Sequence, residues 1–152
     1  TLLLLMAVGA VYAATGHLNF DALAAVAPTL SPALVTVLLT ALLLAFLIKA
    51  GGFPLYAWLP ASYHTLPAPV LALFAGLLTK VGVYAVLRTV GDVFAPAPHL
   101  VMEALGWVAA ATMLFGVLGA AYHWDMRRIL AFHIVSQIGY ILLAIVVLLF
   151  FV

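Results

Sequence analysis

Long apolar runs alternate with short polar or proline-rich stretches along the whole chain. Residues 34–48 contain no charge and show none of the strict apolar and polar alternation that strands of a membrane barrel require. Runs of this kind are typical of transmembrane helices. The pattern predicts an all-α, polytopic transmembrane helix bundle of about five spans. These predicted spans are residues 1–14, 33–59, 70–87, 100–122 and 129–152.

The second predicted span is interrupted in its middle. Lys49 is followed by Gly51, Gly52 and Pro54 inside an otherwise apolar stretch. Proline has no N–H and clashes with the preceding helical turn, so this cluster predicts a broken helix near residues 49–54. Unwound backbone at membrane depth is tolerated where it lies inside the protein or lines a watery cavity.

The segments between the spans are predicted to be polar connections. They comprise residues 15–32, a proline-rich turn at 60–69, residues 89–99 and a short turn at 123–128. The Arg127–Arg128 pair predicts that the last of these lies in the cytoplasm. Aromatic side chains near the span ends fit the belt that aromatic residues form at membrane surfaces. They are Trp58, Tyr63, Trp107 and Trp124.

Composition supports the membrane assignment and excludes several functions. Of 152 residues, 69% are hydrophobic and 6% are charged, whereas soluble domains are about one-quarter charged. A net charge of +1 leaves no basic surface for nucleic acid. The absence of cysteine removes disulfides and thiol chemistry, and no phosphate-binding or dinucleotide-binding motif occurs. The sequence therefore predicts no catalytic residue, metal site or cofactor, and a lipid-embedded protein that is not an enzyme.

Both ends of the chain fall within apolar runs. Thr1 opens one of them and Val152 closes another, without the polar flanks that usually border a membrane domain. This pattern predicts that the sequence is a piece of a longer membrane protein.

Two lysines stand inside predicted spans, which is unusual because a charge in the bilayer interior costs a few kcal/mol or more. Lys49 precedes the helix break, and Lys80 lies about midway along residues 70–87 with Tyr84 one turn further. A lysine removed from water releases its proton more readily, so the pair is a candidate proton relay. Two alternatives remain: snorkelling or packing lysines, and lysines neutralised by buried acids.

The last span carries a polar stripe. His133, Ser136 and Gln137 are spaced i, i+3, i+4 and so share a helical face. One interpretation is interhelical hydrogen bonding. The other is a relay histidine that titrates near neutral pH, with the serine and glutamine ordering water.

Three stretches resemble a known family. Residues 49–63 (KAGGFPLYAWLPASY) resemble the broken-helix signature of the antiporter-like membrane subunits found in Mrp-type multisubunit cation/proton antiporters and respiratory complex I. Residues 77–84 (LLTKVGVY) and 128–140 (RILAFHIVSQIGY) are similar to the D-type membrane component of the Mrp antiporters (MrpD). Many relatives have aspartate where Ala61 stands, so a role for that position is not carried over.

The resemblance implies a fold and a role. The five spans would correspond to the middle of a fourteen-helix subunit, and Lys49 and Lys80 to lysines on its proton-conducting axis. The implied partners are other subunits of an antiporter complex, protons and monovalent cations such as Na⁺, in the bacterial cell (inner) membrane. Two alternatives remain: a proton-pumping subunit of a complex I-like or hydrogenase-like redox enzyme, and a structural membrane scaffold.

Overall fold

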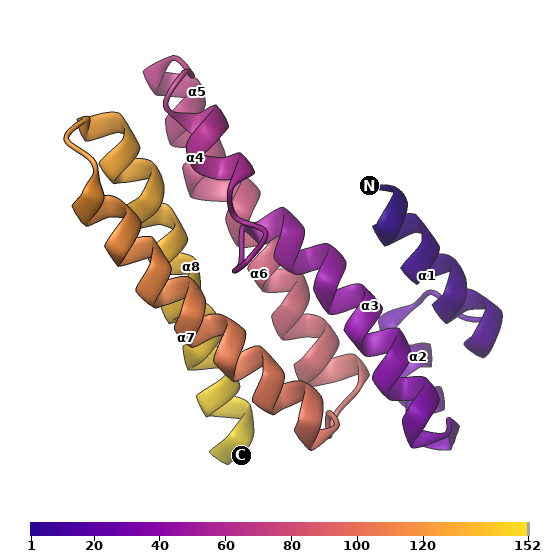
Figure 1. Ribbon diagram of the computed structural model, residues 1–152. Helices are drawn as coiled ribbons and strands as arrows, with labels where there is room; N and C mark the ends of the chain where they lie inside the picture. The colour runs from indigo at the N-terminus through magenta and orange to yellow at the C-terminus, as the bar shows by residue number, and fades with distance from the viewer. Residues whose placement is uncertain (152) are drawn as a thin grey trace.

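Helices make up all the regular structure in the part of the chain that the computed structural model describes, residues 1–151 (Figure 1). The prediction of an all-α fold is confirmed. In chain order the elements are α1 (Leu2–Thr15), α2 (Phe20–Val26), the 3₁₀ helix η1 (Ala27–Thr29), α3 (Pro32–Ala50), α4 (Trp58–Tyr63), α5 (Ala68–Leu73), the π-helix η2 (Phe74–Leu78), α6 (Thr79–Arg88), the π-helix η3 (Thr89–Val93), α7 (His99–Tyr122) and α8 (Met126–Phe151).

Four helical segments are long and apolar enough to cross a membrane: Pro32–Ala50, Ala68–Val93, His99–Tyr122 and Met126–Phe151. The second of these is one continuous helix that contains α5, η2, α6 and η3. A fifth span exists if Leu2–Thr15 and Phe20–Thr29, which are bent by 55° relative to each other, are counted as one. Four to five spans agree with the predicted polytopic bundle.

Several predicted connections are partly helical. The prediction of a loop at residues 15–32 was wrong, because α2 forms there with Asn19 as its N-cap, whose side chain accepts the N–H of Asp21. The turn at 60–69 begins later than expected, because α4 continues to Tyr63. The connection at 89–99 is also shorter, because the helix runs on through η3.

The long helices run alongside one another, with α1 at one side of the bundle and the α7–α8 pair at the other (Figure 1). α1 packs against α3, α3 against α6, and α7 against α8 along most of their lengths, while α8 also contacts α4 and α6. The α7–α8 pair approaches through small residues. A Cβ atom placed on Gly116 would lie 2.5 Å from the backbone nitrogen of Ser136, and one on Gly119 would overlap the ring of Phe132. These glycines form the close interface that lets two membrane helices pack tightly.

Helices α3 and α6, which carry the two lysines, also meet at a glycine. A Cβ atom on Gly82 would lie 2.9 Å from both the backbone nitrogen of Ala50 and the carbonyl oxygen of Phe46. Backbone atoms cannot move aside as side chains can. Gly82 therefore fixes the crossing of α3 and α6 one residue beyond Lys49.

The aromatic residues divide into two groups. Trp107 is 72% exposed and Trp124 is fully exposed, as expected of side chains that face lipid. Tyr63 is 1% exposed, so its assignment to an aromatic belt was wrong. α4 packs against α8, and the phenol of Tyr63 donates a hydrogen bond to the carbonyl of Phe74.

Candidate functional site

The end of α3 is a complete helix break. Gly51 adopts φ 86°, a left-handed conformation that favours glycine, and closes the helix. The N–H groups of Gly51 and Gly52 both donate to the carbonyl of Leu47, each at 2.9 Å. Regular helix does not resume until Trp58, beyond Pro54. The break lies where the sequence predicts it.

Three side chains hold the unwound segment in place. The backbone N–H of Phe53 donates to the Oγ1 of Thr112 on α7 at 2.8 Å, and the ring of Phe53 stacks on that of Phe115 with centroids 4.8 Å apart. The indole Nε1–H of Trp58 donates to the carbonyl of Ile48 at 2.9 Å. Backbone groups freed by the break therefore acquire partners from elsewhere in the fold.

Lys49 occupies the last turn of α3, where the helix dipole favours a positive charge. Its side chain is exposed at the surface of the described chain. It lines a pocket of about 290 Å³ between α1, α3 and α6. Val81, Gly82 and Ala85 form the α6 wall of this pocket. No aspartate or glutamate is among the described residues that line it.

Lys80 lies two residues after the π-helix η2 and is half-buried. Its Nζ donates to the carbonyl of Ala75 at 2.8 Å, so the side chain runs back along its own helix. A π-helix shifts the hydrogen-bond register by one residue, and such segments occur frequently at functional sites. Tyr84, the predicted neighbour one turn further, is 61% exposed.

The two lysines lie on adjoining helices but point in different directions. Gly82 faces α3, and Lys80 is two residues earlier, about 200° around the helix axis. The structure brings the two helices together beside Lys49 and turns Lys80 away, toward Ala75.

The predicted polar stripe of α8 divides in two. Ser136 is 1% exposed and packs against Gly116, whereas His133 and Gln137 lie on an exposed face of α8. The hydroxyls of Ser136 and Thr79 are buried and have no hydrogen-bond partner among residues 1–151. A buried hydroxyl of this kind is usually satisfied by water.

Sequence reasoning missed two residues of this region, Thr112 and Thr79, and misassigned a third, Tyr63. Thr112 and Thr79 are polar residues inside apolar runs, and that isolation was the available signal. Burial raises the pKa of the Tyr63 phenol, which keeps the proton for its bond to Phe74. This bond connects α4, the helix that follows the break, to the first residue of η2.

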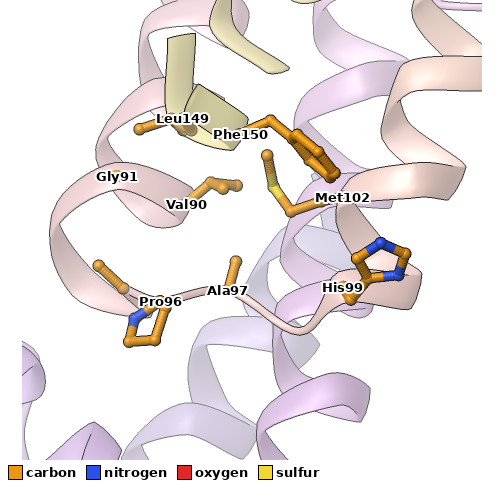
Figure 2. A pocket seen from close by; sticks show the side chains of 9 residues that line it. Val90, Gly91, Pro96, Ala97, His99, Met102, Leu149 and Phe150 are labelled. Atoms are coloured by element: carbon orange, nitrogen blue, oxygen red, sulfur yellow. The ribbon is translucent and has the colours of Figure 1, made fainter. Parts of the chain in front are cut away.

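A separate pocket of about 460 Å³ lies where the α6–α7 connection meets the end of α8 (Figure 2). Figure 2 shows Val90, Met102 and Phe150 around its interior and His99 at its edge. His99 lies 3.9 Å from the carboxylate of Glu103. None of the predicted relay residues lines this pocket. In the part of the chain that the structure describes, no group of three or more His, Asp and Glu side chains is arranged to hold a metal ion.

Residues 1–149 match the family model described as "NADH:quinone oxidoreductase/Mrp antiporter, TM". The chain belongs to this family. It is 42% identical over 144 residues to the D component of the Na⁺/H⁺ antiporter of Alkalihalophilus pseudofirmus. It is also 42% identical over 146 residues to the N component of the NADH-quinone oxidoreductase of Desulforudis audaxviator. These alignments cover 94% of this chain in each case.

A solved structure agrees with the family assignment. The chain matches a chain in the Mrp complex from Dietzia sp. DQ12-45-1b with a TM-score of 0.88 and 38% identity, over 95% of its own length. It spans 27% of that chain and 29% of each of the two relatives named above. The sequence thus corresponds to somewhat more than a quarter of an antiporter-like membrane subunit.

Proposed function

We propose that the chain forms part of the proton-conducting region of a monovalent cation (Na⁺)/H⁺ antiporter subunit. The subunit works with other subunits of a multisubunit complex in the bacterial cell (inner) membrane. Its relay residues are Lys49, Lys80 and His133. The observation that carries this proposal is that each lysine lies at an interruption of a membrane-spanning helix. Lys49 precedes the α3 break and Lys80 follows the π-helix η2.

Helix interruptions suit proton transfer because they provide polar backbone and space for water within the membrane. The Nζ of Lys80 already bonds to a polar backbone group of this kind, the carbonyl of Ala75. Because the lysines point in different directions, the proton passes between them through water rather than by direct contact. Thr79 and Ser136 place further hydroxyls, buried and without a hydrogen-bond partner among residues 1–151, on the helices that carry Lys80 and His133. Tyr84 and Gln137 support the path at its exposed edges.

A second candidate is a proton-pumping subunit of a redox-driven complex. The observation that favours it is the 42% identity to the N component of an NADH-quinone oxidoreductase. The genes next to the one that encodes this chain separate the two candidates. Small antiporter-type membrane subunits indicate an antiporter, and quinone-binding or iron–sulfur subunits indicate a redox complex.

A purely structural scaffold agrees less well with the lysine contacts. That alternative predicts that both lysines are ion-paired inside the complex. Within residues 1–151 the structure contains no ion pair of Lys49 or Lys80, and Lys80 bonds to a carbonyl instead. The bond of Lys80 to a carbonyl is the contact that supports the relay.

The test uses the full-length protein that contains this chain, expressed with its partner subunits in inside-out membrane vesicles. Lys49→Ala and Lys80→Ala are each expected to reduce Na⁺-driven dissipation of the pH gradient at least roughly tenfold, because each removes a proton-carrying group. Arg88→Gln is the matched control, since its exposed ion pair with Asp92 contributes little. Normal antiport in both lysine variants contradicts the proposal.

A further inference from the structure

Thr112 is a polar residue of α7 that contacts the helix break directly. It is 0% exposed. Its Oγ1 accepts the backbone N–H of Phe53 at 2.8 Å and donates its own proton to the carbonyl of Val108 at 2.6 Å. The bond to Val108 fixes the orientation of the hydroxyl, so its lone pairs face the break.

The hydrogen bond to Phe53 is one of two contacts that α7 makes with this residue. Phe115, three residues further along α7, stacks on the ring of Phe53 with an angle of 10° between the planes. α7 thus holds the same residue of the break by its backbone and by its side chain. α7 is itself fixed against α8 through Gly116, where the two helices approach closely.

The position of Lys49 follows from the position of the break. Phe53 is four residues further along the chain, and the intervening backbone is tied to α3 by the bonds of Gly51 and Gly52 to Leu47. Trp58, beyond the break, bonds to the carbonyl of Ile48, the residue before the lysine. A displacement of Phe53 therefore moves the last turn of α3.

We propose that Thr112 is a positioning residue for Lys49, and that its hydroxyl sets where the lysine ammonium lies in the pocket between α1 and α6. This inference rests on the proposed relay role of Lys49. It adds a residue on α7, a helix that contributes none of the relay residues, to the machinery of proton transfer.

The position of the Lys49 ammonium in its pocket determines which groups surround it. The α6 residues that line its pocket are the apolar Val81, Gly82 and Ala85, and the N-terminal segment contributes Thr1, Leu3 and Leu4. Lys80, the charged group of the same region of α6, is turned to Ala75. A small displacement therefore changes how much water and how much apolar wall the ammonium meets.

The test measures antiport against pH in vesicles that contain the full-length protein and its partner subunits. Thr112→Val keeps the shape of the side chain and removes the acceptor, and Thr112→Ser keeps the hydroxyl. We expect Thr112→Val to lower antiport roughly tenfold, since small misplacements of a reacting group have effects of this size or larger. We also expect it to shift the pH of half-maximal antiport by about half a unit or more, and Thr112→Ser to restore both values.

Phe115→Leu is a second probe if Thr112→Val does not accumulate in the membrane. It removes the stacking on Phe53 at a side chain that is 41% exposed, and a smaller shift in the same direction is expected. One result overturns the inference: the variant that accumulates has lower antiport but an unshifted pH profile. Such a result indicates a smaller amount of correctly folded protein. Lys49→Ala is measured alongside. Normal antiport in Lys49→Ala refutes the relay itself, whereas its loss, together with an unshifted profile in Thr112→Val, refutes only the positioning role.

Discussion

The two lysine-bearing helices are interrupted in different ways. α3 stops completely at Gly51, and helix resumes only at Trp58. The helix from Ala68 to Val93 stays continuous and changes register twice, through η2 and η3. Both arrangements place a lysine beside irregular backbone, Lys49 at the end of the span Pro32–Ala50 and Lys80 inside the span Ala68–Val93. Only the first removes backbone hydrogen bonds over several residues.

The two interruptions differ in how far along the sequence their hydrogen-bond partners lie. The freed groups of the α3 break bond to distant side chains, with Thr112 reaching Phe53 across 59 positions of sequence. The π-helical site is local, because Lys80 bonds to a carbonyl five residues away on its own helix. We therefore expect the Lys49 site to be sensitive to changes far away in sequence, and the Lys80 site to be sensitive to the packing of its own helix.

The largest effect on stability is expected at the crossing of the two helices. Gly82→Ala places a Cβ atom 2.9 Å from backbone atoms of α3, so the free energy of unfolding should fall by about 1–3 kcal/mol. Gly76→Ala is the matched control on the same continuous helix, where no atom lies within 4 Å of the added carbon. Its stability should be unchanged or higher by up to about 1 kcal/mol. Denaturation of the purified full-length variants in detergent measures both, and equal stabilities contradict the proposed close contact.

A smaller effect is expected from the distant contacts of the break. Trp58→Phe removes the indole donor to the carbonyl of Ile48, and a loss of about 1 kcal/mol in the free energy of unfolding is expected. Trp107→Phe, at a side chain that is 72% exposed, is the control and should change stability by less than about 0.5 kcal/mol. The same denaturation measurement applies. A Trp58 variant as stable as its control would show that the break does not need this partner.

The sequence predicted local features of the site well. Gly51, Gly52 and Pro54 mark the break because their effect on the backbone is intrinsic to each residue. The lysines could be located because a charge within an apolar run is conspicuous without any knowledge of the fold. The close contact through Gly116 and Gly119 fits the small residues that are typical of helix interfaces in membranes.

Long-range features could not be predicted in the same way. The bond between Thr112 and Phe53 depends on how α7 lies against the break, which no local pattern encodes. The different environments of Ser136 and His133 depend on which side of α8 meets Gly116. The π-helices were missed because they change the hydrogen-bond register without requiring glycine or proline.

Antiport by lysine-to-arginine variants tests the central claim most directly. Arginine keeps the positive charge but does not release its proton at accessible pH, so Lys49→Arg and Lys80→Arg separate proton transfer from charge alone. The account predicts that each variant, in vesicles carrying the full-length protein and its partner subunits, loses antiport at least roughly tenfold while accumulating normally. Antiport at the unmodified rate in both arginine variants would show that these lysines supply only a charge, and would contradict the relay.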